Sequence, residues 1–223
     1  MSRWPDCLDR RPAGVVFDCD GLLVDTEPSW DWANEQLFLR RGREMAEVDT
    51  TQLLGLSTPV SIALLAQWLD EVGREQELFD ELLVAVSGRI QTHAQVMPGA
   101  AELVGELRDR GVPVAVASNS PLPIVELALT RGGLADSFDV VVSADHVQHP
   151  KPAPDLYLLA CSRLGVASSA AIGCEDSRTG LAAVQAAGMG SIGVPTLPGD
   201  FPADWVLPSL AHPAVADWIS SWG

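Results

Sequence analysis

Acidic residues follow two separate apolar segments of this 223-residue sequence, at the point where each segment ends. Asp18 and Asp20 follow the first segment, and Glu175 and Asp176 follow another much later in the chain. Because side chains two apart in an extended backbone leave on the same side, Asp18 and Asp20 are predicted to face one cleft. Four carboxylates that converge there repel one another unless protons or a cation neutralise them, and hard oxygen ligands of this kind suit Mg²⁺. The residues therefore predict a magnesium site that also takes substrate phosphate oxygens.

Two further positions supply groups that a transferring phosphoryl group needs. Ser118 and Asn119 follow a second apolar segment, and the hydroxyl of Ser118 can donate a hydrogen bond. Lys151 is the single lysine of a chain that otherwise uses arginine, and it lies in a proline-stiffened loop after a third segment. Its compact ammonium can neutralise charge that develops on a phosphoryl group.

Each of these features also has a purely structural explanation. An Asp-x-Asp sequence after a strand is often a turn or a helix cap, Ser-Asn and Glu-Asp pairs often cap the next helix, and a lone lysine is usually a solvated surface residue. Their conjunction favours chemistry, because all of them fall at the carboxyl ends of predicted strands. Open parallel sheets bind their ligands at that edge.

The elements that would position these residues alternate between strand and helix after residue 96. The predicted strands are 13–17, 112–117, 140–142, 170–174 and 191–194. Helices are predicted between them, the last one over 213–218, and the proline-rich stretch 195–208 is predicted to be a surface connection. Continuously apolar strands separated by helices predict a parallel sheet that is covered on both faces.

Residues 28–95 differ from the rest, because their apolar residues recur at helical spacing and no convincing strand is present. The predicted fold class is therefore α/β, a doubly wound parallel sheet with an all-helical cap inserted after the first strand. The predicted domains are a catalytic core, residues 1–24 and 97–223, and a helical cap domain, residues 25–96.

The same residues resemble, in order, the four motifs of the haloacid dehalogenase-like (HAD) superfamily. The first motif is FDCDGLLVDTE at residues 17–27, and the others are Ser118-Asn119, Lys151-Pro152, and Glu175-Asp176-Ser177 with Gly180 and residues 187–189. The resemblance covers the chain from about residue 13. It points to the helical-cap branch that includes β-phosphoglucomutase and phosphoglycolate phosphatase, and it implies a Rossmann-like core.

The resemblance implies roles for the four acidic residues. Asp18 would attack phosphorus and form an aspartyl-phosphate, and Asp20 would protonate the leaving oxygen and then activate water. Magnesium would be held by Asp18, by the backbone carbonyl of Asp20 and by Asp176. Glu175 would be either a direct metal ligand or one water removed.

The remaining motif residues would bind the phosphoryl oxygens. By resemblance this group comprises Ser118, Asn119 and Lys151. The chain departs from the family in one place, because His149-Pro150 stands where a glycine usually precedes the lysine. We expect His149 to be a solvated loop residue.

The predicted activity is hydrolysis of phosphate monoesters of small metabolites such as sugar phosphates, with Mg²⁺ as cofactor. Asp20 argues against a dehalogenase, which lacks this aspartate and the metal, and the lysine-free insert argues against phosphonate hydrolysis through a Schiff base. A phosphosugar mutase of the β-phosphoglucomutase type stays the alternative. Relatives with that activity carry a histidine where Trp30 aligns and an arginine where Thr58 aligns, and this chain has neither. A binding module without catalysis is disfavoured, because no catalytic position is degraded.

The insert is predicted to act as a mobile lid and to decide the substrate. It joins the core through two connections, residues 24–28 and 95–99, and the second contains a Pro-Gly pair. Candidate substrate contacts, each of which is more often a core or surface residue, are Glu27, Trp30, Ser57, Thr58, Trp68 and Arg89.

Composition and hydropathy limit the partners and the cellular location that we expect for this protein. A net charge of −16 argues against nucleic acid, because binding its phosphates requires clustered lysine and arginine. No apolar run approaches the roughly 18 residues of a membrane span, and no signal peptide begins the sequence, so a cytoplasmic protein is expected. The four cysteines have neither zinc nor disulfide spacing. The expected partner is a small phosphorylated metabolite, and the expected state is a monomer or weak homodimer.

Overall fold

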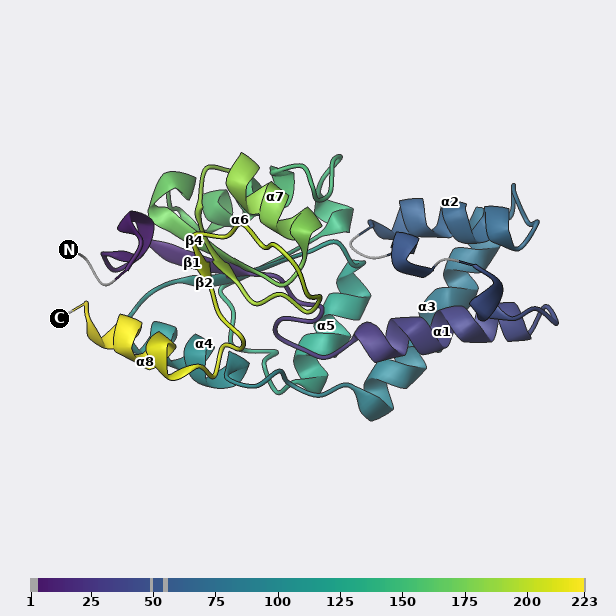
Figure 1. The fold of residues 1–223 in the computed structure, drawn as a ribbon, viewed down its shortest axis with the longest axis horizontal. Coiled ribbons are helices and arrows are strands. Elements are labelled where there is room, and N and C mark those ends of the chain that lie inside the picture. The colour runs from purple at the N-terminus through teal and green to yellow at the C-terminus, as the bar shows by residue number, and fades with distance from the viewer. Residues whose placement is uncertain (1–3, 49, 54–55, 223) are drawn as a thin grey trace.

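The computed structural model describes residues 4–48, 50–53 and 56–222 as a molecule of two lobes (Figure 1). One lobe is a sheet with helices on both faces, and the other contains three helices. The strands are β1 (Gly14–Phe17), β2 (Val114–Ser118), β3 (Val140–Ser143), β4 (Ala171–Glu175), β5 (Gly190–Gly193) and β6 (Trp205–Val206). The helices are α1 (Glu27–Leu39), α2 (Thr58–Trp68), α3 (Glu75–His93), α4 (Ala100–Asp109), α5 (Leu122–Arg131), α6 (Asp155–Leu164), α7 (Arg178–Ala186) and α8 (Pro213–Ser220).

The sheet is parallel throughout, with the strand order β3-β2-β1-β4-β5-β6. Phe17, the last residue of β1, pairs with Val116 of β2 and with Cys174 of β4. Asp18 therefore lies beside Glu175, at the carboxyl ends of two neighbouring strands. The strand order reverses at this point, which is where doubly wound sheets bind their ligands. The predicted α/β class is confirmed.

Side chains of β1 alternate between two cores, which explains why the strand is apolar throughout. Val15 and Phe17 belong to the core cluster that includes residues of α4, α5 and α8, whereas Val16 belongs to the cluster that includes residues of α6 and α7. Figure 1 shows α6 and α7 on one side of the sheet and α4 and α8 on the other. Because both faces of β1 are covered, its carboxyl end is held rigidly.

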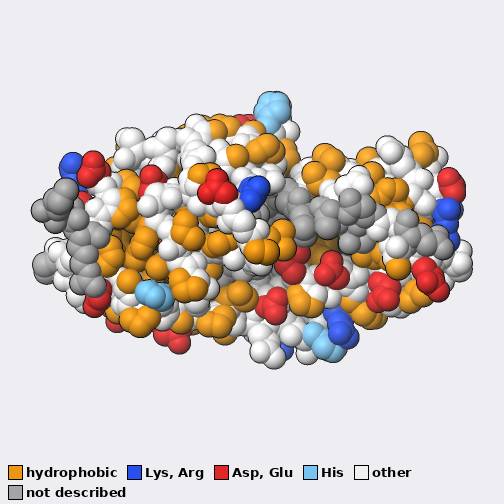
Figure 2. All heavy atoms as spheres, in the orientation of Figure 1, with side chains coloured by type: hydrophobic (Ala, Val, Ile, Leu, Met, Phe, Trp, Pro, Cys, Tyr) orange, Lys and Arg blue, Asp and Glu red, His pale blue; other side chains and the backbone are white. Residues whose placement is uncertain are grey.

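The helices α1, α2 and α3 form the second lobe, between β1 and β2 in the sequence. The helix α1 packs along α3 through apolar side chains such as Leu37 and Leu78, both of which are fully buried. Figure 2 shows acidic side chains spread over this lobe, in keeping with the net charge of −16.

The two connections between the lobes run side by side. The amide of Asp25 donates to the carbonyl of Gln95 at 2.8 Å, and the amide of Met97 donates to the carbonyl of Leu23 at 2.8 Å. Gly99 then adopts a φ of 83°, and a Cβ there would lie 2.1 Å from the amide nitrogen of Ala211. The domain boundaries at residues 24 and 97 and the lid motion stay predictions.

The proline-rich stretch 195–208 was predicted to be a surface connection, and this is wrong for its end. Trp205 and Val206 form β6, which pairs with β5 at the sheet edge. The strand has only two residues and follows a stretch that contains several prolines and a glycine. Its sequence therefore has no alternating pattern from which a strand could be predicted. The ring of Trp205 also contacts Trp4 and Trp218 edge to face, with centroids 5.2 Å and 5.9 Å away. No helix in the described part of the chain is long and apolar enough to cross a bilayer.

Candidate active site

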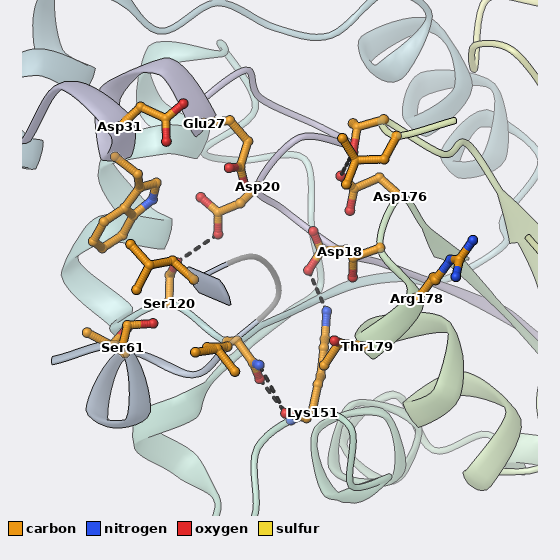
Figure 3. Close-up of a pocket in the computed structure, with 18 of the residues that line it drawn as sticks. Asp18, Asp20, Glu27, Asp31, Ser61, Ser120, Lys151, Asp176, Arg178 and Thr179 are labelled. Atoms are coloured by element: carbon orange, nitrogen blue, oxygen red, sulfur yellow. Dashed lines mark hydrogen bonds and ion pairs between the residues drawn. The ribbon is translucent and has the colours of Figure 1, made fainter. Parts of the chain in front are cut away.

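A cleft of about 780 Å³ lies at the carboxyl edge of the sheet and reaches under the helical lobe. Its size falls within the range of small-molecule sites. Figure 3 shows Asp18 and Lys151 pointing toward each other in it, with Asp20 and Asp176 on either side. The core contributes the predicted residues Asp18, Asp20, Asn119, Lys151 and Asp176 to its lining, and the other lobe contributes Glu27, Trp30, Asp31, Asn34, Leu53, Leu56, Thr58, Ser61 and Leu82.

Lys151 is the cation at the centre of the site. Its Nζ donates to Asp18 Oδ1 and, at 2.6 Å, to Glu175 Oε1, and its side chain is only 3% exposed. The backbone of Lys151 is fixed by Asn119, whose Oδ1 accepts from the Lys151 amide at 2.8 Å and whose Nδ2 donates to the Lys151 carbonyl at 3.2 Å. Asn119 of the second motif thus fixes the loop that positions Lys151 of the third motif.

Glu175 lies behind the cleft, fully buried, and several groups fix its carboxylate. The hydroxyl of Tyr157 donates to Oε1 at 2.6 Å, and the hydroxyl of Ser177 donates to Oε2 at 3.1 Å. Gly180 leaves room for this carboxylate, since a Cβ there would lie 1.8 Å from Oε1. Sequence reasoning missed Tyr157, although it is the only tyrosine of the chain and follows Lys151 by six residues.

Three buried carboxylates come together at this point. Oxygen atoms of Asp18, Glu175 and Asp176 all lie within 4.8 Å of one another. Burial, followed by the charges of Glu175 and Asp176, raises the pKa of Asp18, although Lys151 opposes the rise. Burial and the charge of Glu175 raise the pKa of Asp176 to about 8. Burial lowers the pKa of Lys151, but Asp18 and Glu175 raise it more, so the ammonium stays protonated.

This donor set fits a magnesium ion. One ammonium faces three carboxylates, so the cluster carries excess negative charge when all are ionised, and a divalent cation would favour those ionised forms. The ligands are hard carboxylate oxygens, which Mg²⁺ prefers. The candidate ligands are therefore Asp18 and Asp176, with Glu175 close enough to contribute. The carboxylate of Asp20 is not part of this group among the described residues.

Asp20 is instead held by three hydroxyl groups. Thr26 Oγ1 donates to Oδ1 at 2.6 Å, and Ser118 Oγ and Ser120 Oγ donate to Oδ2 at 3.0 Å and 2.8 Å. Ser118 is fully buried and does not line the cleft, whereas Ser120 does. Binding of a phosphoryl oxygen by Ser118 stays a prediction, and the contact that the structure shows for it is the one with Asp20.

The predicted substrate contacts divide into two groups. Glu27, Trp30 and Thr58 line the cleft, whereas Ser57, Trp68 and Arg89 do not; the guanidinium of Arg89 lies over the Trp32 ring, 5.2 Å from its centroid. Cleft residues that the sequence did not indicate include Asp31, Asn34, Ser61 and Thr196. These residues belong to none of the sequence motifs described above, so only the fold shows that they lie together. His149 is solvated, as predicted, and its ring contacts Asp155 at 3.2 Å.

Comparison with known proteins identifies the family that this geometry suggests. A model of the haloacid dehalogenase-like hydrolases matches residues 15–194. The chain belongs to this family. Hexitol phosphatase B of Escherichia coli is 33% identical over 189 residues, which cover 83% of this chain and 85% of that protein. The phosphatase relatives support the assignment of this haloacid dehalogenase-like chain as a hydrolase of phosphate monoesters.

Solved structures share the fold. A CbbY variant from Rhodobacter sphaeroides, in complex with xylulose-(1,5)bisphosphate, superposes with a TM-score of 0.80 at 26% identity, over 91% of this chain and 96% of that chain. A β-phosphoglucomutase from Clostridium difficile gives a TM-score of 0.78 at 21% identity, over 95% of this chain and 99% of that chain. The second likeness shows the fold alone.

Proposed function

We propose that this haloacid dehalogenase-like hydrolase is a magnesium-dependent phosphatase of small phosphorylated metabolites, such as sugar phosphates, and that it acts through an aspartyl-phosphate on Asp18. The observation that carries the proposal is the contact of the buried Lys151 ammonium with Asp18, beside a second aspartate at the carboxyl end of β1. An ionised carboxylate next to a fixed cation is prepared to attack a phosphorus atom that the same cation attracts.

The transfer takes place in two steps. In the first, a carboxylate oxygen of Asp18 forms a bond to phosphorus, the bond from phosphorus to the ester oxygen breaks, and a proton from the Asp20 carboxyl group goes to the departing oxygen. In the second, Asp20 takes a proton from water, the water oxygen bonds to phosphorus, and the bond to Asp18 breaks. The hydroxyl contacts of Thr26, Ser118 and Ser120 support this role, because they fix the orientation of the Asp20 carboxylate.

Lys151 and the residues around it would bind the phosphoryl group. Its ammonium neutralises phosphoryl oxygens, and Asn119 keeps the Lys151 backbone in place. Magnesium bound by Asp18, Asp176, the Asp20 carbonyl and, directly or through water, Glu175 would supply further neutralisation of phosphate charge. In this arrangement Glu175 acts chiefly through Lys151, whose Nζ it contacts at 2.6 Å.

A mutase of the β-phosphoglucomutase type remains the alternative activity. A mutase must bind the distal phosphate of its bisphosphate intermediate, and this requires a cationic side chain on the helical lobe. Among the described residues that line the cleft, those of the helical lobe include carboxylates but no lysine, arginine or histidine. This absence favours hydrolysis.

Two measurements test the proposal. Release of phosphate from p-nitrophenyl phosphate should require Mg²⁺ and should vanish in Asp18→Asn; more than a few per cent of residual activity, which corresponds to roughly 2 kcal/mol of barrier or less, would contradict the mechanism. Incubation with β-glucose 1-phosphate and a trace of the 1,6-bisphosphate separates the two activities. Free phosphate should form faster than glucose 6-phosphate, and the reverse order would make the enzyme a mutase.

A further inference from the structure

Tyr157 lies on α6 beside the proposed catalytic residues, although it belongs to none of the sequence motifs. Its side chain is fully buried in the core cluster that also contains Val16 and Val184. Its hydroxyl donates to Glu175 Oε1 at 2.6 Å, and the Lys151 ammonium lies over its ring, 5.1 Å from the centroid. One side chain therefore contacts both members of a buried ion pair. A phenylalanine would fill the same apolar space, so packing alone does not require the hydroxyl.

The carboxylate of Glu175 is occupied by donors from the chain. A carboxylate has about four acceptor positions, two on each oxygen. Oε1 accepts from the Tyr157 hydroxyl and from Lys151 Nζ, both at 2.6 Å. Oε2 accepts from the hydroxyl of Ser177 at 3.1 Å and, more weakly, from its amide at 3.4 Å. A metal ion could bind Glu175 directly only by displacing one of these donors, and a buried donor that loses its acceptor destabilises the protein.

Asp176, the next residue in the chain, has a different environment. It lines the cleft, and Glu175 is not among the described residues that do so. Asp176 Oδ2 accepts from Thr196 Oγ1 at 3.3 Å, which is a contact with a hydroxyl and not with a cation. The ion pairs of Lys151 are instead with Asp18 and Glu175. Of the two adjacent carboxylates, Asp176 is therefore the one that is open to a metal ion.

We propose that Tyr157 is a positioning residue for phosphoryl transfer, and that it keeps Glu175 on Lys151 and off the metal ion. The proposal rests on the phosphatase activity inferred above and adds a residue that acts through Glu175. With the hydroxyl in place the carboxylate has one preferred orientation, and Lys151 is held between Glu175 and Asp18. A cation that is fixed before the reaction stabilises charge on a transferring phosphoryl group without having to reorient. Tyr157 thus supports catalysis although it is not among the described residues that line the cleft.

The first test compares the wild type with Tyr157→Phe, which keeps the ring and removes only the hydroxyl. In saturating Mg²⁺, kcat/KM for p-nitrophenyl phosphate should fall about tenfold, which corresponds to about 1.4 kcal/mol of barrier. Calorimetric binding of inorganic phosphate in the same buffer should also weaken by about tenfold, because Lys151 is no longer held in place. This measurement needs no turnover, so it tests the position of Lys151 even if the protein proves not to be a phosphatase. Values within about twofold of the wild type in both measurements would overturn the proposal.

Ala160→Gly is the matched control, because Ala160 is fully buried on the same helix and its methyl group makes no hydrogen bond. The change should lower the melting temperature by about 2–4 °C, a fall comparable to that expected for Tyr157→Phe. It should leave kcat/KM and phosphate binding within about twofold of the wild type. Equal losses in both variants would contradict the proposal, because the effect would then come from the stability of α6 and not from the hydroxyl.

The second test measures metal binding without relying on activity. Mg²⁺ is titrated calorimetrically into metal-free Glu175→Gln and Asp176→Asn, in which each change replaces a carboxylate by its carboxamide. The loss of affinity in Asp176→Asn should exceed that in Glu175→Gln by about tenfold or more, because only the first variant loses a ligand. Tyr157→Phe should bind Mg²⁺ within about twofold of the wild type, and this result is informative even if Glu175→Gln fails to fold. An equal or greater loss in Glu175→Gln would make Glu175 a metal ligand and overturn the proposal, as would a loss in Tyr157→Phe equal to that in Asp176→Asn.

Discussion

Replacing Gly180 by alanine should destabilise the protein, although the same change within a helix usually stabilises it. Replacing a glycine within a helix by alanine ordinarily stabilises a protein by about 0.5–1 kcal/mol. At Gly180 the added Cβ would lie 1.8 Å from Glu175 Oε1 and 2.0 Å from its Cδ. Glu175 is fully buried and is held by Lys151 and Tyr157, so it cannot move aside without breaking those contacts. Overpacking of this kind costs about 1–3 kcal/mol, so Gly180→Ala should lower the free energy of unfolding.

The control is Gly105→Ala on α4, where no atom lies within 4 Å of the added Cβ. Urea unfolding should show a gain of about 0.5–1 kcal/mol for this variant and a loss for Gly180→Ala. Turnover of p-nitrophenyl phosphate should fall about a hundredfold in Gly180→Ala alone, because displacement of Glu175 also displaces Lys151 from the phosphoryl site. If both variants gained stability and kept full activity, the packing of Glu175 described above would be wrong.

Three other substitutions test the charges around Asp18. Lys151→Arg should abolish activity although it keeps the charge, because the planar guanidinium is bulkier than an ammonium. A kcat/KM near that of the wild type would mean that Lys151 has no part in the reaction. Tyr157→Phe should lower stability by about 1–2 kcal/mol, because it leaves Oε1 of Glu175 with one donor fewer, and urea unfolding without a matching loss would refute this hydrogen bond. Asp176→Asn in excess chelator should gain stability relative to wild type as the pH rises from about 4 to about 8, and the difference should stay constant above that. Folding raises the pKa of Asp176 from 3.8 to about 8, so over this range the folded state keeps a proton that the unfolded state has lost, and the wild type loses stability until the buried carboxyl itself ionises; a constant difference across this range in thermal unfolding would contradict the cause given.

Much of the fold follows from local pattern. The apolar run before Asp18 is buried on both faces, so a continuous hydrophobic strand and a parallel sheet were predictable. The short strand formed by Trp205 and Val206 was not, because two residues after a proline-rich loop carry no periodicity. That strand depends on pairing with β5, a contact that lies outside its own sequence.

The convergence of the proposed catalytic residues was predictable, because Asp18 and Asp176 directly follow strands and Lys151 lies in a loop after one. Asp18, Lys151 and Asp176 meet as predicted in the cleft, and their residue types alone indicated the chemistry. The supporting groups were not predictable, since Tyr157 lies on the apolar face of α6 and looks like an ordinary core residue. Asn34 likewise lies on the buried face of α1, and only the tertiary structure shows that its Oδ1 atom has no hydrogen-bond partner in the described part of the chain.

The central claim is that a phosphoryl group passes through Asp18. Enzyme mixed with excess radiolabelled substrate and Mg²⁺, then quenched in acid during turnover, can be digested and its peptides identified by mass spectrometry. The account predicts covalent phosphate on the peptide that contains Asp18, released by hydroxylamine as an acyl phosphate should be, and none in Asp18→Asn. Label on a different residue, or on Asp18→Asn to the same extent, would contradict it.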